Sequence, residues 1–372
     1  MKPEKQNTQN FKGESMIDLK ISPYSLNKQK KHVFLTNNLS ELTNYHYNNC
    51  IEYRNILDAL SFNVLDITDY LTIPFLPVKL FKELSLLSTS PINIIKTMTS
   101  SGTTGQVVSK IFLDKETATA QQKILSIIIT DFIGKKRMPM IILDTSAILK
   151  DRTLFSARGA GILGFSLFAY DKIYALNDKM ELNIEGLKKF LSNHKDEQIL
   201  LFGFTFMIWQ HFYKELENSF YRPDLSKGIL IHGGGWKKLI SEEVPPELFK
   251  LRLNEVCGIT HIHDYYGMVE QTGTVHVECM EGYLHTSIYS DIITRRPLDY
   301  KPCDIGEKGI IQTVSIIPKS YPGHSLLTED EGIIYGEDNC KCGRLGKYFK
   351  ILGRIKNAEI RGCSDTYADK FK

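Results

Sequence analysis

Small hydrogen-bond donors are concentrated in one stretch of the sequence, TMTSSGTTGQ, which covers residues 97–106. Gly102 and Gly105 allow the backbone to turn closely around an anion, while hydroxyl groups and exposed amides can donate hydrogen bonds to its oxygens. The stretch has neither the Gly-Lys-Ser/Thr ending of a Walker loop nor the GxGxxG spacing of a dinucleotide fold. On its own, it indicates either a phosphate-binding loop or a polar turn after the apolar residues 92–95.

Thiols are the second group of side chains that could do chemistry. Their number is odd, their spacing is not that of a disulfide framework, and no export signal precedes them. We therefore expect reduced thiols, which leaves metal binding or nucleophilic chemistry as roles beyond packing. The cysteines are Cys50, Cys257, Cys279, Cys303, Cys340, Cys342 and Cys363.

Alternating strand and helix patterns are expected to position these residues. Residues 139–144, 198–204 and 228–236 read as buried strands, and residues 185–194 have helical spacing. This alternation predicts an α/β core with a mainly parallel sheet. Apolar and aromatic residues at helical spacing over 39–60 predict a helical layer that precedes the core.

Four regions follow from these patterns. Residues 1–15 are polar and predicted to be a disordered tail, and residues 16–90 are predicted to be a helical N-terminal region. Residues 91–283 are predicted to form the α/β core. Residues 284–372, with short β-branched runs and several turn signals, are predicted to form a smaller β-rich subdomain and a C-terminal tail.

Composition narrows the class of protein. The 372 residues are 42% hydrophobic and 24% charged, which suits a globular protein with a large core. The net charge of +3 is small and the basic residues are dispersed, so we expect no nucleic-acid partner. The polar start lacks the apolar core of a signal peptide, and runs such as 199–209 are too short to span a bilayer. We therefore expect a cytoplasmic protein without a membrane span.

Three further motifs follow the Ser/Thr/Gly stretch in order. DYYGMVEQTG covers residues 264–273, LLTEDEG covers 326–332 with Asp330 expected at a strand–turn junction, and GRIKNAEIRG covers 353–362. In this order they resemble the motifs of adenylate-forming enzymes. With HGGGWKKL at 232–239 and GCSDTYADKF at 362–371, the sequence over residues 40–372 resembles the LuxE-like acyl-protein synthetase family of the bacterial fatty-acid reductase system, related to phenylacetate-CoA ligases.

The resemblance implies a nucleotide site for ATP and Mg²⁺. Glu270 would hold Mg²⁺, Tyr266 would stack on or border the adenine, Asp330 would accept hydrogen bonds from the ribose, and Arg354 would lie near the ribose or α-phosphate. Lys110 stands further from the loop than the family's lysine and is not assigned to a phosphate. The loop residues implied to wrap the phosphates are Thr99, Ser100, Ser101, Gly102, Thr103, Thr104 and Gly105. The glycines implied to flank the base are Gly234, Gly235 and Gly267.

The resemblance also implies an acyl acceptor. Adenylate-forming ligases carry a further small C-terminal domain after a hinge that here matches residues 357–362, and only ten residues follow Gly362. We therefore expect that domain to be lacking. Cys363 would instead take the acyl group as a thioester, the alternative being an incidental tail cysteine. Residues 156–168 and 202–209 combine glycine with aromatics, as an apolar slot for the acyl group or as plain core.

A second metal site is suggested by Cys279, His285, Cys340 and Cys342, which would form a Cys₃His set. Relatives of the phenylacetate-CoA ligases carry similar Cys/His pairs in this region. The CxC spacing is tighter than the CxxC of most structural zinc sites. Bound Zn²⁺ and an ordinary core of reduced thiols are both kept as interpretations.

The function expected from the sequence is ATP-dependent activation of a carboxylic acid, expected to be a fatty acid, to an acyl-adenylate. Transfer to Cys363 and onward to a reductase or carrier protein would follow. Two alternatives stay open: a ligase that delivers to CoA or a carrier protein without acylating itself, and a non-catalytic nucleotide-binding partner of a reductase. Pyrophosphate exchange and covalent labelling separate the three.

Overall fold

A mainly parallel sheet forms the core of one part of the computed structural model, which describes residues 21–100, 108–149, 157–236 and 242–355. Its strand order is β5-β4-β6-β7-β8-β9, with β8 and β9 antiparallel and all other neighbours parallel. All residues of β4, β6 and β7 are buried, as expected for strands covered on both faces. The strands are β4 (Met138–Thr145), β5 (Ala169–Leu176), β6 (Leu200–Phe204), β7 (Ile229–Gly233), β8 (His261–Tyr266) and β9 (His276–Val277).

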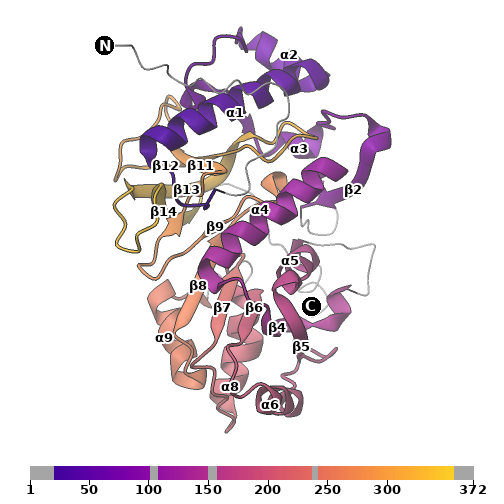
Figure 1. Ribbon diagram of the computed structural model, residues 1–372, viewed down its shortest axis with the longest axis vertical. Helices are drawn as coiled ribbons and strands as arrows, with labels where there is room; N and C mark the ends of the chain where they lie inside the picture. The colour runs from indigo at the N-terminus through magenta and orange to yellow at the C-terminus, as the bar shows by residue number, and fades with distance from the viewer. Residues whose placement is uncertain (1–20, 101–107, 150–156, 237–241, 356–372) are drawn as a thin grey trace, which may run out of the picture.

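Helices cover both faces of this sheet (Figure 1). The alternation of side chains along β4 shows why both faces are apolar: Met140 and Ile142 join one core cluster, whereas Ile141 and Leu143 join the other. The helices are α4 (Lys115–Ile133), α5 (Ala157–Phe165), α6 (Ile184–Asn193), α7 (Thr205–Met207), the π-helical turn η6 (Ile208–Tyr213), α8 (Lys214–Asn218) and α9 (Pro246–Cys257).

A second sheet, mostly antiparallel, has the order β10-β14-β13-β12-β11. The two residues of β1 (Leu76–Pro77) pair in parallel with its long strand β13. Its strands are β10 (Leu284–His285), β11 (Ser290–Arg295), β12 (Lys308–Ser315), β13 (Ser325–Glu337) and β14 (Lys347–Arg354). This sheet lies in the upper half of Figure 1, beneath the N-terminal helices.

The N-terminal segment contributes α1 (Lys28–Asn49), α2 (Ile51–Ala59) and α3 (Leu80–Glu83). Asn27 caps α1 by accepting a hydrogen bond from the backbone N–H of Lys30. The continuous helical pattern expected over 39–60 is interrupted at Cys50, whose backbone is extended between α1 and α2. Short 3₁₀ turns occur at η1 (Tyr70–Thr72) and η2 (Pro91–Asn93).

A two-stranded hairpin carries the Ser/Thr/Gly stretch. β2 (Ile94–Thr99) and β3 (Lys110–Asp114) pair antiparallel, with Thr99 opposite Lys110. Met98 of β2 and Ile111 of β3 are buried in a core cluster that also contains Tyr321. The hairpin is therefore packed against the body of the protein where the strands approach the stretch.

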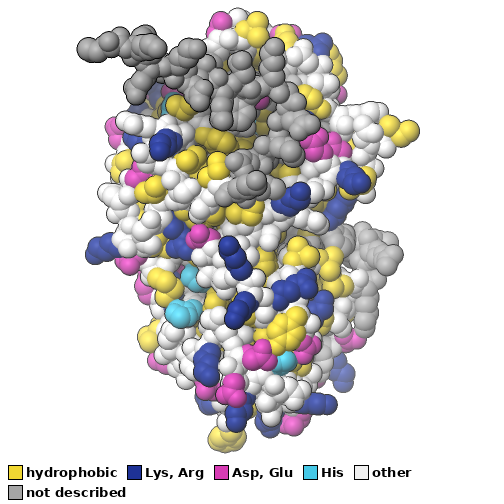
Figure 2. Space-filling view, in the orientation of Figure 1, with side chains coloured by type: hydrophobic (Ala, Val, Ile, Leu, Met, Phe, Trp, Pro, Cys, Tyr) yellow, Lys and Arg dark blue, Asp and Glu magenta, His cyan; other side chains and the backbone are white. Residues whose placement is uncertain are grey.

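The architecture confirms the α/β fold with a mainly parallel sheet and a β-rich C-terminal part. One local expectation was wrong: Asp330 does not stand at a strand–turn junction, because β13 continues through it from Ser325 to Glu337 and pairs with β14 from Asp330 onward. Within the described ranges, no helix combines the length and apolar character that crossing a membrane requires. Lys and Arg side chains are interspersed with Asp and Glu over the face shown in Figure 2.

Candidate active site

The carboxyl ends of β7 and β8 lie side by side and bring two glycine-containing motifs together. Gly234 and Gly235 follow β7, and Gly267 follows β8 directly after Tyr266. Gly234 has a φ of +86°, and a Cβ there would lie 2.7 Å from a ring atom of Phe204, so a side chain is excluded on two grounds. In open α/β sheets this edge is where ligands bind.

Tyr266 links this edge to the second sheet. Its hydroxyl donates a 2.7 Å hydrogen bond to Oδ2 of Asp330, 64 residues along the chain. Burial and the Asp330 carboxylate raise the pKa of Tyr266 well above its ordinary value, so the phenol remains the donor. The Tyr266 ring stacks on His276 with centroids 6.2 Å apart. Tyr266, expected beside the adenine, therefore also orients the carboxylate expected to bind the ribose.

Arg354 stands opposite Asp330 in the register of β13 and β14. Its Nε lies 3.9 Å from Oδ1 of Asp330, and its Nη1 lies 3.8 Å from Oε2 of Glu329. Glu329 also lies 3.7 Å from Nζ of Lys79. The motifs do not single out Glu329 as a partner of Arg354. Its position next to Asp330 in TEDEG is the one local sign of that role.

Glu270 lies on a three-residue 3₁₀ turn, η8 (Val269–Gln271), and its side chain is buried. This turn is packed against the β2–β3 hairpin: Oγ1 of Thr272, which donates to the carbonyl of Val269 at 2.7 Å, also lies 3.7 Å from Sδ of Met98. The structure therefore places the proposed metal ligand beside the strand that leads into the Ser/Thr/Gly stretch. Mg²⁺ prefers hard oxygen ligands such as carboxylates, so Glu270 is chemically suited to the expected ion.

Thr99 and Ser100 are the loop residues that the structure describes. The backbone N–H of Ser100 donates to the carbonyl of Ser109 at 3.2 Å, and the N–H of Ser109 donates to Oγ of Ser100 at 2.9 Å. These two bonds pair the chain on either side of residues 101–107. The loop positions outside the described residues are Ser101, Gly102, Thr103, Thr104 and Gly105, and the expected acceptor Cys363 also lies outside them.

The aromatic stretches expected near an acyl slot meet at β6 and α5. Phe165 and Phe202 stack with ring centroids 4.1 Å apart, and Phe165 also contacts Tyr265 at 5.6 Å. A Cβ at Gly161 would lie 3.3 Å from ring atoms of Phe202 and Phe204, so glycine there permits close packing. Tyr265 packs against Gly233 and Phe204 against Gly234 at the glycine-motif edge, whereas Trp209 belongs to the core cluster on the opposite face of the sheet.

The Cys/His set is assembled in one place. The ligand atoms of Cys279, His285, Cys340 and Cys342 all lie within 4.8 Å of one another. The two sulfurs of Cys279 and Cys340 are 3.9 Å apart, and Sγ of Cys342 is 3.3 Å from Nε2 of His285. A tetrahedral zinc ion would separate two sulfurs by about 3.8 Å and a sulfur from a nitrogen by about 3.5 Å. The donor set and its spacing therefore fit Zn²⁺.

The loop that carries Cys340 and Cys342 is fixed to two helices. Arg344 donates from Nε to Oδ1 of Asp131 at 2.9 Å and lies 3.8 Å above the ring of Phe132, both on α4. Asp338 accepts hydrogen bonds from the backbone of Lys28 and Gly346, each at 2.7 Å. The loop thus connects the second sheet to α1 and to α4, the helix that follows the β2–β3 hairpin.

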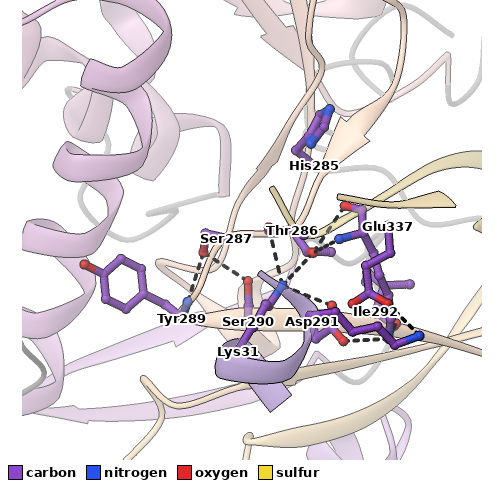
Figure 3. A network of polar contacts seen from close by, with 12 residues as sticks. Lys31, His285, Thr286, Ser287, Tyr289, Ser290, Asp291, Ile292 and Glu337 are labelled. Atoms are coloured by element: carbon purple, nitrogen blue, oxygen red, sulfur yellow. Dashed lines mark hydrogen bonds and ion pairs between the residues drawn. The ribbon is translucent and has the colours of Figure 1, made fainter. Parts of the chain in front are cut away.

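A buried charge network adjoins the other side of this cluster (Figure 3). Nζ of Lys31 donates to Oγ1 of Thr286, the neighbour of His285, at 2.7 Å, and lies 3.2 Å from Oδ1 of Asp291. Lys347 and Tyr70 donate to Oδ2 of Asp291 at 2.6 and 2.5 Å. Burial alone would raise the pKa of Asp291, but the two ammonium groups and the hydrogen bonds hold it below its ordinary value. No local motif in the sequence indicates this network.

Sequence comparison decides the family. The profile of the family described as "Acyl-protein synthetase, LuxE" matches residues 3–372. The chain belongs to this acyl-protein synthetase family. The synthetase is 25% identical over 362 residues to the long-chain-fatty-acid–luciferin-component ligase of Vibrio harveyi, a match that covers 94% of this chain and 90% of the relative. The family resemblance and the enzyme type expected from the motifs are confirmed.

Solved structures share the fold of this acyl-protein synthetase. An open conformation of 2-hydroxyisobutyryl-CoA ligase, in complex with 2-HIB-AMP and CoA, superposes with a TM-score of 0.70 at 12% identity, covering 89% of this chain and 71% of that one. The same ligase in its postadenylation state gives a TM-score of 0.69 at 13% identity, covering 89% and 69%. The chain is therefore an acyl-protein synthetase with the fold of adenylate-forming ligases.

Proposed function

We propose that this synthetase activates a long-chain fatty acid with ATP and transfers the acyl group to its own Cys363. In the first step a carboxylate oxygen attacks the α-phosphorus of ATP, forming the acyl-adenylate and releasing pyrophosphate. In the second step the Cys363 thiolate attacks the acyl carbon, the acyl–phosphate bond breaks and AMP leaves. The thioester is then delivered to a reductase or carrier protein.

One observation carries the first step: the Glu270 turn, the hairpin that leads into the Ser/Thr/Gly stretch and the Tyr266–Asp330 pair lie near the carboxyl ends of the parallel strands. The Glu270 turn packs on the hairpin that leads into the Ser/Thr/Gly stretch, and Tyr266, between the glycine motif and the second sheet, holds Asp330. The residues from Thr99 to Gly105 would donate hydrogen bonds to the phosphates. Fixed donors of this kind stabilise the charge that develops on the leaving pyrophosphate.

The residues proposed to contact the ribose, the base and Mg²⁺ belong to the same site. Asp330 would accept hydrogen bonds from the ribose hydroxyls, with Arg354 beside the ribose or α-phosphate and the glycines at 234 and 235 leaving room for the base. Glu270 would hold Mg²⁺, which when bound neutralises charge on the phosphate oxygens. The fatty-acid substrate is proposed because the family relative from Vibrio harveyi is described as a long-chain-fatty-acid ligase.

We also propose that Cys279, His285, Cys340 and Cys342 hold a structural Zn²⁺. Burial lowers the pKa of His285 to about 4, so the imidazole is neutral and has a lone pair to give to a metal. Four protein ligands would close the coordination sphere, as in structural rather than catalytic zinc sites.

Intact-mass measurement after incubation with ATP, Mg²⁺ and a panel of acids tests the whole proposal. A mass increase equal to one acyl group, seen with long-chain acids and only with ATP, is expected. Acid-dependent pyrophosphate release without a mass increase would instead favour delivery to CoA or a carrier protein. No acid-dependent release would reject an adenylating enzyme.

A further inference from the structure

Gln271, the residue after Glu270, is buried, and both the nitrogen and the oxygen of its side-chain amide form hydrogen bonds. Its Nε2 donates to the carbonyl of Thr313 at 3.1 Å and to the carbonyl of Gly323 at 2.9 Å, and its Oε1 accepts from the hydroxyl of Thr313 at 2.9 Å. Thr313 belongs to β12, and Gly323 belongs to the segment that enters β13. One side chain therefore ties the Glu270 turn to two other segments of the protein.

The turn is short, and its own hydrogen bonds are local: the hydroxyl of Thr272 donates to the carbonyl of Val269 at 2.7 Å. η8 has three residues, and its backbone bond from the N–H of Gln271 to the carbonyl of Met268 is 3.2 Å long. A 3₁₀ turn of this length is stabilised by its surroundings rather than by its own hydrogen bonds. What fixes the neighbours of Glu270 therefore helps to fix the position of the turn that carries its side chain.

The segment around Gly323 lies directly against Glu270. A Cβ at Gly323 would stand 2.8 Å from the carbonyl oxygen of Glu270 and 2.3 Å from a ring atom of Tyr321. Tyr321 is fully buried, and burial and then the charge of Glu270 raise its pKa. The contact leaves no space for the turn to shift toward this segment, while the Gln271 amide prevents it from moving away.

We propose that Gln271 is a positioning residue that holds the Glu270 carboxylate in the geometry needed to bind the metal–nucleotide complex. The inference rests on the proposed role of Glu270 as a Mg²⁺ ligand. Displacing a metal-binding carboxylate by about 1 Å can lower the rate on the order of a hundredfold. The buried amide of Gln271, with three hydrogen bonds to two segments, would prevent such a displacement of Glu270. Its loss weakens the affinity for the metal–nucleotide complex and leaves the affinity for the acid unchanged.

The test measures Mn²⁺ binding, by electron paramagnetic resonance, to the full chain with a non-hydrolysable ATP analogue. Gln271→Met keeps the approximate volume and removes all three hydrogen bonds, and we expect the dissociation constant for Mn²⁺ to rise about tenfold or more. The Mg²⁺ concentration for half-maximal pyrophosphate exchange should rise in parallel, with the KM for the acid unchanged.

A milder pair of variants controls for instability. Thr313→Val removes one hydroxyl bond to Gln271, whereas Thr274→Val removes one hydroxyl bond, 2.7 Å long, from the same turn segment to Ser315. Both threonines are buried, so the two changes cost similar stability. We expect about a threefold weaker Mn²⁺ affinity for Thr313→Val and an unchanged one for Thr274→Val. Adding Thr313→Val to Gln271→Met should weaken binding no further.

Glu270→Gln separates the two claims. If this variant loses Mn²⁺ affinity while Gln271→Met and Thr313→Val bind like the wild type, the positioning role is wrong and the proposed function of Glu270 stands. If Glu270→Gln binds Mn²⁺ as tightly as the wild type, the metal role of Glu270 is wrong and the positioning role with it. If Thr313→Val and Thr274→Val weaken Mn²⁺ affinity equally, the effect of Gln271 is a general loss of stability, and the inference is also overturned.

Discussion

The phenol of Tyr266 donates a 2.7 Å hydrogen bond to the carboxylate of Asp330 and so links the two sheets. The bond runs from the end of a parallel strand to the middle of the longest antiparallel strand. Both residues belong to motifs expected to contact the nucleoside, so each sheet would contribute one half of that contact.

Tyr266→Phe tests whether this bond orients Asp330. A hydrogen bond to a charged group contributes about 1.5–3 kcal/mol, so the variant should raise the KM for ATP about tenfold and change kcat less. The measurement is pyrophosphate exchange as a function of ATP concentration. Tyr45→Phe is the matched control, because that phenol donates a 3.0 Å bond to the carbonyl of Ser88 in the N-terminal layer. An unchanged KM in Tyr266→Phe would remove the orienting role.

Zinc content tests the Cys/His cluster. Protein purified without added metal should contain about one zinc per chain, and Cys342→Ser should lose it with a Tm lower by about 5–10 °C. Elemental analysis and thermal unfolding measure the two effects. Cys303→Ser, at another partly buried thiol, should keep both zinc and Tm. Metal-free wild-type protein of normal stability would make the four residues ordinary core.

The buried histidines predict a loss of stability in mild acid. Burial lowers the pKa of His324 to about 3, and burial and His324 lower that of His46, whose ring stacks on it at 4.8 Å. Because an unfolded histidine has a pKa of about 6.5, the unfolded chain binds more protons below that pH, and stability is lost as pH falls from there toward the folded pKa.

His324→Gln should make the free energy of unfolding less dependent on pH. The slope between pH 6 and 4.5 should fall by about 1.4 kcal/mol per pH unit, the contribution of one histidine that stays neutral in the folded state. Chemical denaturation at a series of pH values gives both slopes. Identical slopes for variant and wild type would mean that His324 is already protonated in the folded protein.

Cys363→Ser separates the two half-reactions. The variant should keep pyrophosphate exchange near the wild-type rate, because acyl-adenylate formation uses no thiol. Wild-type protein given ATP and labelled tetradecanoic acid should carry label that neutral hydroxylamine releases, and the variant should carry none that is labile in this way. Equal, labile labelling of both proteins would assign the acceptor role to another cysteine.

Local patterns predicted much of this fold. The apolar run that became β4 needs no distant information, because a strand buried on both faces is apolar throughout. The break between α1 and α2 at Cys50 had no glycine or proline to signal it. The stretch LLTEDEG predicts Asp330 at a strand–turn junction, yet the strand continues because β14 pairs with it from Asp330 onward.

The supporting shell of the candidate site could not be predicted, for a different reason. Glu270 was found through its motif, but the partners of Gln271 lie 42 and 52 residues further on. Lys31 and Asp291 are 260 residues apart, and neither stands in a recognisable motif. Contacts of this kind are set by the packing of whole sheets and helices, which a single sequence does not display.

Acid-dependent exchange of pyrophosphate into ATP is the measurement that tests the central claim most directly. The wild type should exchange label only when a long-chain acid and Mg²⁺ are present, and Glu270→Gln should lower the rate on the order of a hundredfold or more while remaining folded. Glu116→Gln, which changes an exposed carboxylate paired with Lys319, should exchange at the wild-type rate. Exchange without any acid, or a near-normal rate in Glu270→Gln, would contradict the account.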